Sequence, residues 1–437
     1  MTTMVTPKPN ITTPPTGAAD RAASPAPLRP GIAYVGAALP SRSETFVYRE
    51  LLGLRDRGWP VTAVSVHTPQ RDLGEPALDR LADEAITIYA RGGAALLADA
   101  IKQCIASPVR SIKTLTRGKL DAFFGRDVKL SARPKVLVQC VAGLALAHRL
   151  KPYNITWLHS HMAHVPTTIT MYAAQAMGVG FSFTGHAADL TRDRCLLRAK
   201  LRRAGFAPCI SHWHQAFFAQ EAGAKQREDQ RPIVRCGVAM AQFTPSQRVA
   251  TGDLRILAVG RLVAKKGFDV LVDAVHETPG VVVTLVGDGP EQAALAAQVE
   301  RLGLGERIDM VGAKDNHAVR AMLGEADAFV LPCRVAASGD RDGIPVVLME
   351  AMAAGLPVIS GDLPTIRELV EHDKTGLLID PEDSTALPAA IARLRDDAAL
   401  RKRLADAGRR RVQGHADLAI GMGKALADSF ASARAVF

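Results

Sequence analysis

Two cations in one loop of this 437-residue sequence have the type and spacing of an anion-binding site. Arg261 and Lys266 lie in the stretch 260–267, which follows an apolar run and precedes an amphipathic helical pattern. Two cations beside a helix N-terminus bind anions strongly, because their charge acts together with the exposed N–H groups of the helix. A diphosphate is the ligand that this arrangement favours, and a solvated basic loop is the alternative.

Two carboxylates belong to a second loop and the helix that follows it. Asp342 precedes an apolar helical stretch and Glu350 lies inside it, where a carboxylate needs a partner such as sugar hydroxyls. Asp340 and Asp342 also form a DxD pattern that could hold a divalent metal. Because the basic loop already supplies positive charge, we expect no metal here. The loop continues with Gly343, Ile344 and Pro345, and this proline suits an early helical position.

Two further loops also follow apolar runs. Gly287 begins a turn in which Gln292 stands at the third glycine position of a dinucleotide fingerprint, so nicotinamide binding is not expected. Gly287 instead suits a tight turn next to a ligand or a strand. His186 follows the run 180–184, which places it at the carboxyl edge of a sheet, facing a cleft or serving as a structural histidine.

Other histidines lie close together in the sequence. His159 and His161 would point the same way along a strand and could bind a metal, but no matching carboxylate or cysteine set is obvious. We therefore expect loop or cleft-lining roles for them and for His212 and His214. The six cysteines form no CxxC pair, which is typical of small core residues in a reducing compartment.

The elements that must position these loops alternate between strand and helix from Gly31 onward. Apolar runs bounded by Gly and Pro and separated by helical stretches indicate βαβ units around parallel sheets. Expected strands cover 31–35, 61–67, 155–159, 180–184, 254–260, 281–287, 328–332 and 358–360. The expected fold class is α/β, with two Rossmann-like doubly wound domains facing a cleft.

Composition suggests where these domains begin and end. Residues 1–30 contain seven prolines and no aromatic residue, so a disordered leader is expected. An N-terminal Rossmann-like domain is expected over 31–245 and a C-terminal Rossmann-like domain over 250–415. Residues 416–437 are expected to form a C-terminal helix that packs back toward the N-terminal domain.

The net charge of +10 is unevenly distributed. Residues 1–250 have a net charge of +15 (32 Lys and Arg, 17 Asp and Glu), whereas 251–437 have −5 (22 and 27). One basic segment, 100–135, carries interleaved aromatic residues, which is typical of a helix that binds an anionic membrane surface or of a solvated helical face. A second basic segment covers 192–203. No nucleic-acid motif accompanies the charge. The first segment contains Lys102, Arg110, Lys113, Arg117, Lys119, Arg126, Lys129, Arg133 and Lys135.

The N-terminus shows no secretory signal, and the longest apolar run, 136–147, is shorter than the roughly 20 residues of a membrane span. These observations favour a cytoplasmic protein that contacts a membrane only peripherally.

Taken together, the loops resemble a known family. "VGRLVAKKGFDVLVDA" (259–274), "LVGDGPE" (285–291), "DGIPVVLMEAMAAGLPVIS" (342–360) and "KTGLLIDPED" (374–383) are similar to family 4 glycosyltransferases of the GT-B fold. "LPSRSETFVYREL" (39–51) and "FSFTGHAADL" (181–190) resemble the bacterial exopolysaccharide and lipopolysaccharide branch. The resemblance covers about residues 31–437.

The resemblance implies that the N-terminal domain lies on the acceptor side and that the C-terminal domain binds the nucleotide sugar. It also implies roles for individual residues. Arg261 and Lys266 would bind the donor diphosphate, Glu350 the nucleotide ribose, Asp342 the transferred sugar, and His186 would lie near that sugar. Asp342 departs from the family's E-x7-E motif, since its side chain is one methylene shorter than the usual Glu.

The implied activity is a retaining, metal-independent transfer of a hexose-type sugar from a nucleoside diphosphate to an acceptor hydroxyl. A lipid-linked, polyprenyl-diphosphate saccharide at the inner face of the plasma membrane is the implied acceptor. A GT-B epimerase or phosphorylase, or a non-catalytic nucleotide-sugar- or membrane-binding protein, are alternatives. The donor base, the linkage and the oligomeric state are left open by the sequence.

Overall fold

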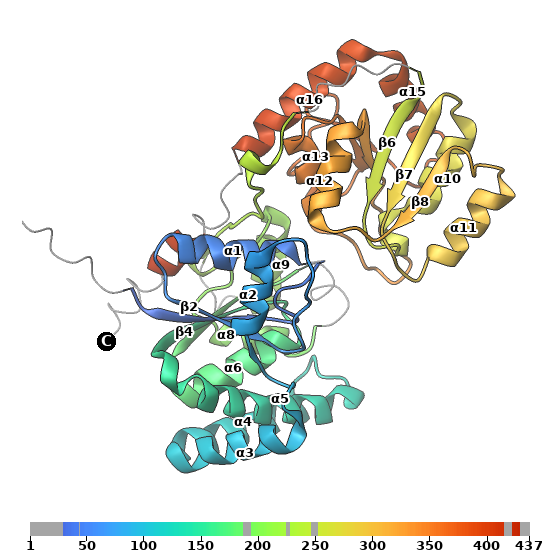
Figure 1. Cartoon of the computed structure of the whole chain (residues 1–437). Coiled ribbons are helices and arrows are strands. Elements are labelled where there is room, and N and C mark those ends of the chain that lie inside the picture. Colours follow the sequence, from blue (N-terminus) through green and yellow to red (C-terminus); the bar gives the residue numbers. More distant parts are fainter. Residues whose placement is uncertain are drawn as a thin grey trace, which may run out of the picture.

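The computed structural model describes residues 29–42, 44–186, 194–223, 228–245, 252–414 and 422–428, and it confirms the α/β class. The first domain surrounds a five-stranded sheet (Figure 1). Its strands are β1 (Gly31–Gly36), β2 (Val61–Ser65), β3 (Ile86–Thr87), β4 (Ile155–His161) and β5 (Gly180–Thr184). Its helices are α1 (Thr45–Asp56), α2 (Pro76–Glu84), α3 (Gly92–Ala106), α4 (Pro108–Phe124), α5 (Arg133–Arg149), α6 (Val165–Met177), α8 (Leu197–Arg203) and α9 (His212–Ala222).

The second domain surrounds a six-stranded sheet. Its strands are β6 (Leu254–Val259), β7 (Val281–Val286), β8 (Ile308–Gly312), β9 (Ala328–Leu331), β10 (Val358–Gly361) and β11 (Leu377–Ile379). Its helices are α10 (Phe268–Glu277), α11 (Gln292–Arg301), α12 (Asn316–Glu325), α13 (Val346–Ala353), α14 (Pro364–Arg367), α15 (Ala386–Asp396) and α16 (Ala398–Gln413).

Both sheets have the strand order of a doubly wound fold. The first runs β3-β2-β1-β4-β5 and the second β11-β10-β9-β6-β7-β8, and the recorded strand pairs are parallel. β1 and β9 are buried along their whole length, as expected for strands covered by helices on both faces. The order reverses between β1 and β4 and between β6 and β9, so ligands are expected at the carboxyl ends of these strands.

Three helices, α3 to α5, are inserted between β3 and β4. They lie at the end of the first domain that is farthest from the second (Figure 1). By length and composition alone, residues 130–149 would be long and apolar enough to cross a membrane. In the structure, however, Cys140, Leu144 and Leu146 of α5 are buried in the first domain's core, as in a core helix.

The second basic segment, 192–203, is only partly exposed: among its described cations Arg194, Arg198 and Arg202 are exposed, whereas Lys200 and Arg203 bond within the domain. Lys200 is fully buried, and its Nζ donates to the carbonyl oxygens of Ala163, His164 and Cys195 at 2.6–3.0 Å. Arg203 donates two hydrogen bonds to the carboxylate of Asp121, both at 2.6 Å. Three carbonyls thus compensate the buried Lys200 and a carboxylate pairs with the half-buried Arg203, which a basic pattern alone does not reveal.

The two ends of the chain lie largely outside the described residues. Of the expected leader, only Arg29 and Pro30 are described. Residues 422–428 are helical and pack on the first domain beside α1, with Met422 and Leu426 in the same core cluster as Leu54 and Trp59 (Figure 1).

Candidate active site

A cavity of about 960 Å³ lies between the two domains, at the carboxyl ends of their strands. It is lined from the second domain by the loops after β6, β7 and β9, and from the first domain by α1 and the segment after β5. Nine residues that the sequence analysis singled out line this one cavity: His186, Arg261, Lys266, Gly287, Asp342, Gly343, Ile344, Pro345 and Glu350. The structure therefore brings together residues that are up to 164 positions apart in the sequence.

Lys266 and Asp342 form an ion pair within this cavity. Lys266 Nζ lies 2.7 Å from Asp342 Oδ2, and Lys265 Nζ lies 3.4 Å from Asp342 Oδ1. Burial alone would raise the pKa of Asp342, but the charges of Lys266 and Lys265 outweigh it and hold that pKa below its ordinary value. Burial would likewise lower the pKa of Lys266, but Asp342 outweighs it and the pKa is raised. Both groups are therefore charged at neutral pH.

Arg261 differs from Lys266 in its surroundings. It is exposed at the cavity wall, and its side chain forms no ion pair with any described residue. The basic loop thus offers two ammonium groups, of Lys265 and Lys266, that already have carboxylate partners and one guanidinium group that is available to an anion. A guanidinium can bind a phosphate through two parallel N–H donors.

Glu350 lies on α13 and is paired across the cleft. Its Oε1 accepts a hydrogen bond from Arg49 Nη1 of α1 at 2.9 Å, and both side chains are largely buried. Tyr48, which precedes Arg49 on α1, accepts a hydrogen bond at its hydroxyl from Asn316 at the start of α12, at 2.6 Å. The partner that the apolar helix requires for its carboxylate is thus a guanidinium from the other domain, which sequence reasoning did not anticipate.

Gly287 brings two loops of the second domain into direct contact. Its φ is +150°, and a Cβ there would overlap the carbonyl oxygen of Gly260, next to Arg261. Only glycine allows the turn after β7 to lie this close to the basic loop.

The variant Gly287→Ala is therefore expected to displace the basic loop and to weaken binding of the expected diphosphate ligand at least tenfold, with a stability loss of about 1–3 kcal/mol. Calorimetric titration with nucleoside diphosphates and thermal unfolding measure both effects. Gly305→Ala is the matched control, since a Cβ at Gly305 meets nothing within 4 Å. Unchanged binding in Gly287→Ala would contradict this role.

His186 lies in the cleft directly after β5, with the ring of Phe46 at a centroid distance of 4.4 Å. Its Nε2 is 3.0 Å from Nδ1 of His161. Burial lowers the pKa of His186 well below its ordinary value, and the neighbouring His161 lowers it further. The ring is therefore neutral at physiological pH.

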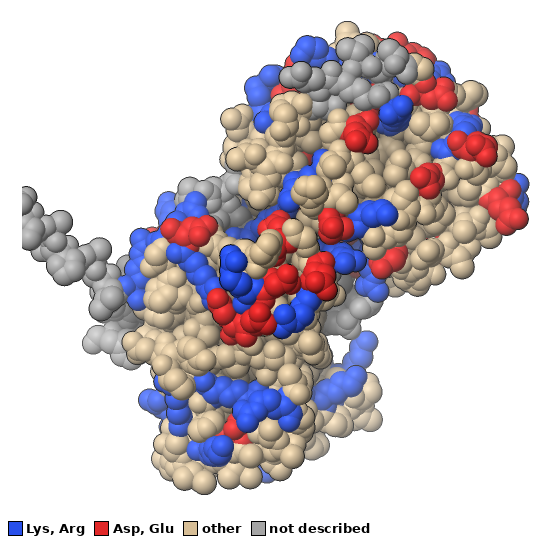
Figure 2. All heavy atoms as spheres, viewed as in Figure 1, with Lys and Arg blue, Asp and Glu red and all other residues tan. Residues whose placement is uncertain are grey.

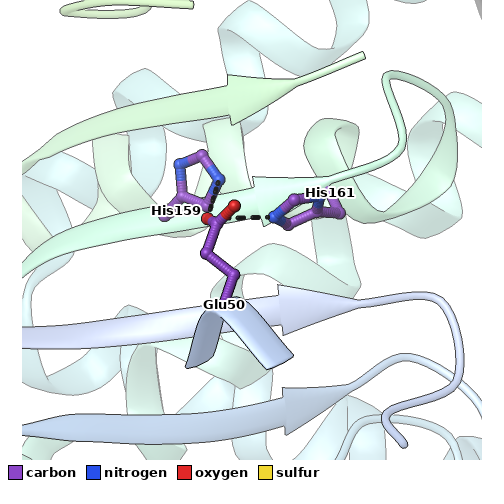
Figure 3. A group of neighbouring side chains, drawn as sticks. All are labelled: Glu50, His159 and His161. Carbon is purple, nitrogen blue, oxygen red and sulfur yellow. Dashed lines mark hydrogen bonds and ion pairs between the residues drawn. The ribbon is translucent and has the colours of Figure 1, made fainter. Parts of the chain in front are cut away.

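The expectation of loop or cleft-lining roles is wrong for His159 and His161. Both lie inside β4, which extends two residues farther than expected, and both are buried. Together with Glu50 of α1 they form a cluster whose ligating atoms lie within 4.8 Å of one another (Figure 3). Sequence reasoning missed Glu50, although it shares the buried face of α1 with Val47, Leu51 and Leu54.

The five cations expected at a membrane or acceptor are not part of the cleft. Lys113, Arg117 and Lys119 belong to α4, while Arg126 and Lys129 follow it, and all five are exposed.

Comparison with known proteins shows where this architecture occurs. A model of the family "Glycosyl transferases group 1" matches residues 241–411, which include Arg261, Lys266, Asp342 and Glu350. The amylovoran biosynthesis glycosyltransferase AmsK of Erwinia amylovora is 30% identical over 374 residues, covering 81% of this chain and 88% of AmsK. The chain belongs to the group 1 glycosyltransferases. The protein named colanic acid biosynthesis glycosyltransferase WcaL of Escherichia coli K12 is 41% identical to this group 1 chain, over 37% of the chain and 41% of WcaL.

Solved structures support the same group 1 fold. Sucrose-phosphate synthase from Thermosynechococcus elongatus superimposes with a TM-score of 0.70 at 21% identity, over 92% of this chain and 100% of that one. HepE from Anabaena, solved with UDP-glucose, superimposes with a TM-score of 0.66 at 16% identity, over 92% of this chain and 99% of HepE. The sequence alignment with WcaL covers less than half of WcaL, whereas the two structural superpositions cover both domains of this chain. The expected GT-B fold is confirmed.

Proposed function

We propose that this group 1 glycosyltransferase moves a hexose-type sugar from a nucleoside diphosphate to an acceptor hydroxyl, with retention of the anomeric configuration. The observation that carries the proposal is the convergence of Arg261 and Lys266 with Asp342 and Glu350 in one interdomain cleft. A cavity of about 960 Å³ falls in the range of small-molecule sites. HepE, solved with UDP-glucose, supports a nucleotide sugar as the donor.

The chemistry follows from where charge develops. Breaking the glycosidic bond makes the sugar oxocarbenium-like and places negative charge on the leaving diphosphate. Arg261 and Lys266 stabilise that charge where it forms, and the leaving diphosphate accepts the proton of the incoming hydroxyl. Glu350 binds the ribose, while Asp342 and His186 hold the sugar. Closure of the two domains excludes water and limits hydrolysis.

The reaction is proposed to need no metal. Both carboxylates of the DxD pattern have ammonium partners, since Lys265 lies 3.2 Å from Asp340 and Lys266 lies 2.7 Å from Asp342. A divalent cation would have to enter a site whose carboxylates are already neutralised by two lysines. EDTA is therefore expected to change the rate of nucleotide release by less than about twofold. Complete loss of activity that magnesium restores would contradict the proposal.

For the acceptor we propose a polyprenyl-diphosphate-linked oligosaccharide used in exopolysaccharide synthesis, at the inner face of the plasma membrane. AmsK and WcaL are named for the biosynthesis of two such polymers, amylovoran and colanic acid. The proposal places the protein in the cytoplasm as a peripheral membrane protein.

The surface of α3, α4 and the start of α5 supports membrane contact. Among the described residues, ten of the twelve exposed large hydrophobic side chains lie between positions 97 and 138. Asp99 and Asp121 of this region are buried in ion pairs with Arg149 and Arg203, so the outer face is basic (Figure 2). Apolar side chains among cations suit an anionic leaflet. We call these ten residues the apolar-basic face: Leu97, Ile101, Ile105, Val109, Ile112, Leu120, Phe123, Phe124, Leu130 and Val138.

Flotation with vesicles tests this face. The protein is expected to float with vesicles rich in anionic lipid at low salt and to dissociate as salt rises, because each basic residue contributes about 1 kcal/mol at such a surface. The double variant Phe123→Ser/Phe124→Ser should lose most of the binding. Tyr153→Ser, at an exposed residue outside the face, is the matched control. Equal flotation of both variants would contradict membrane contact through these residues.

A donor screen tests the activity itself. Release of free nucleotide from one nucleotide sugar is expected only when a lipid-linked acceptor extract is present. Release without acceptor would instead indicate an epimerase or a hydrolytic side reaction, and binding without any turnover would indicate a non-catalytic protein.

A further inference from the structure

A second cavity, of about 580 Å³, lies in the first domain, and the proposed reaction makes no use of it. It opens between α4 and α6, which pack along each other (Figure 1), and β5 and α8 contribute to its wall. Its volume falls in the range of small-molecule sites. We call this cavity the α4–α6 groove; its wall includes Ile112, Thr116 and Leu120 of α4, Met171 of α6 and Phe181 of β5.

The α4–α6 groove lies away from the interdomain cleft. The cleft residue His186 follows the end of β5, whereas the groove contacts Phe181 near the beginning of that strand. A strand rises about 3.3 Å per residue, so Phe181 lies about 10 Å before Thr184 along β5. Among the described residues, none lines both cavities. A ligand in the groove would therefore be distinct from the sugar donor and from the hydroxyl that accepts the sugar.

The groove has an apolar base and an apolar rim. Met171 and Phe181 are only 2% and 4% exposed, so the base belongs to the domain core. Ile112 and Leu120, in contrast, are 63% and 43% exposed and belong to the apolar-basic face. With Thr116 they form one row along α4, because residues four positions apart are neighbours on a helix. The groove is therefore continuous with the face proposed to contact the membrane.

Two cations lie beside this row. Lys113 and Arg117 line the groove, are exposed and are also four positions apart, which places their Cβ atoms about 5–6 Å from each other. Within the described part of the chain, Lys113 has no carboxylate partner, and Arg117 Nε lies 3.7 Å from Asp121 Oδ1. An exposed ion pair at this distance contributes little. Both side chains are therefore available to an anion.

Asp121 does not neutralise the groove, because its carboxylate has other partners. It accepts two hydrogen bonds from Arg203 at 2.6 Å and one from the hydroxyl of Tyr172 at 3.0 Å. No Asp or Glu occurs among the described residues that line the groove. The groove thus combines an apolar base with uncompensated positive charge at its rim.

We propose that the α4–α6 groove binds one anionic phospholipid, with Lys113 and Arg117 on the oxygens of its phosphate and with Ile112, Leu120 and Phe181 along an acyl chain. Two cations one helical turn apart can reach separate oxygens of one phosphate, and such charge-assisted hydrogen bonds are strong. A free phosphate would leave the apolar wall in contact with water, whereas an acyl chain covers it. The proposal rests on the proposed membrane contact for the orientation of the groove, and it adds a single site that requires a negatively charged lipid.

Calorimetric titration of the full-length protein with dihexanoyl phosphatidylglycerol tests this site, because the short-chain lipid is monomeric below its critical micelle concentration. Saturable binding to a single site is expected. Dihexanoyl phosphatidylcholine has the same acyl chains and phosphate but also a cationic choline, so it should bind at least about tenfold more weakly. Inorganic phosphate should also bind at least about tenfold more weakly, because it covers no apolar surface.

Three variants separate the groove from general electrostatic attraction. Lys113→Gln/Arg117→Gln should weaken binding of dihexanoyl phosphatidylglycerol at least about tenfold. Lys119→Gln/Lys129→Gln is the matched control, since it removes the same charge from exposed positions that do not line the groove, and it should change binding less than about twofold. Thr116→Trp keeps every charge but fills the groove and should abolish binding. All five positions are exposed, and thermal unfolding verifies that the variants fold.

Four results would overturn the proposal: equal weakening in the two charge variants, unchanged binding in Thr116→Trp, equal affinity for phosphatidylcholine, or equal affinity for inorganic phosphate. The titration needs neither a bilayer nor a sugar donor. If the protein fails to float with anionic vesicles, the proposed membrane contact fails, and if it transfers no sugar, the proposed activity fails. In both cases the titration still decides whether the groove binds a lipid.

Discussion

Replacing Lys266 by alanine is expected to lower the turnover of the nucleotide-sugar donor by about 100- to 1,000-fold, the usual effect of removing one group that stabilises developing negative charge. Lys266 Nζ is held at the end of the basic loop, 2.7 Å from Asp342, and its pKa is raised, so it is a fixed positive charge at neutral pH. The measurement is the rate of nucleotide release by purified, folded variants. The loss should appear mainly in kcat, because in the proposed reaction the charge on the diphosphate grows in the transition state.

This variant also leaves Asp342 with one cation fewer, and the resulting destabilisation must be separated from the catalytic loss. In Lys266→Ala/Asp342→Asn neither member of the pair is charged, so thermal stability should recover relative to the single variant. Turnover should stay low. Lys265→Ala is a milder control, because Lys265 lies farther from Asp342, at 3.4 Å. If Lys266→Ala keeps near wild-type turnover, the assignment of the diphosphate site is wrong.

The second large effect is expected from Glu350→Gln. The amide can still accept a hydrogen bond but has no charge, so it should bind both Arg49 and the ribose hydroxyls of the proposed donor more weakly. Hydrogen bonds to charged groups contribute about 1.5–3 kcal/mol, which corresponds to a loss in kcat/KM of roughly 10- to 100-fold. Most of this loss should appear as a higher KM for the donor, because the proposed ribose contact exists both before and during the reaction.

A matched control for Glu350→Gln is Glu368→Gln. Glu368 is also a carboxylate at the domain boundary, where it accepts from the backbone N–H groups of His212 and Trp213 at 2.9 and 3.0 Å. Its loss should lower thermal stability and leave the KM of the donor unchanged. Equal KM values for the two variants would contradict a ribose-binding role for Glu350.

The second domain's half of the site could be predicted from the sequence because its geometry is local. Arg261, Gly287 and Asp342 each lie in a loop that follows a buried strand, and the carboxyl ends of parallel strands meet at one edge. Their order along the chain was therefore enough to place them in one cleft.

The contacts of the first domain could not be predicted in this way. Arg49 is 301 positions from Glu350, and Glu50 is 111 positions from His161, so no local pattern links the partners. The burial of Lys200 could not be predicted for a related reason. Its side chain is compensated by three backbone carbonyls, and the sequence does not show where carbonyls converge.

Three consecutive residues of α1 serve three different parts of the molecule. Tyr48 contacts Asn316 of α12, Arg49 contacts Glu350 of α13, and Glu50 bonds to Tyr34 in the core of its own domain. Consecutive positions on a helix differ by about 100° in direction, which lets one turn reach all three partners. The contacts of α1 with both domains thus depend on how a single helical turn is rotated about the helix axis. Inserting or deleting one residue ahead of Tyr48 within α1 would rotate that turn away from every partner at once, even though each of the three side chains would still be present.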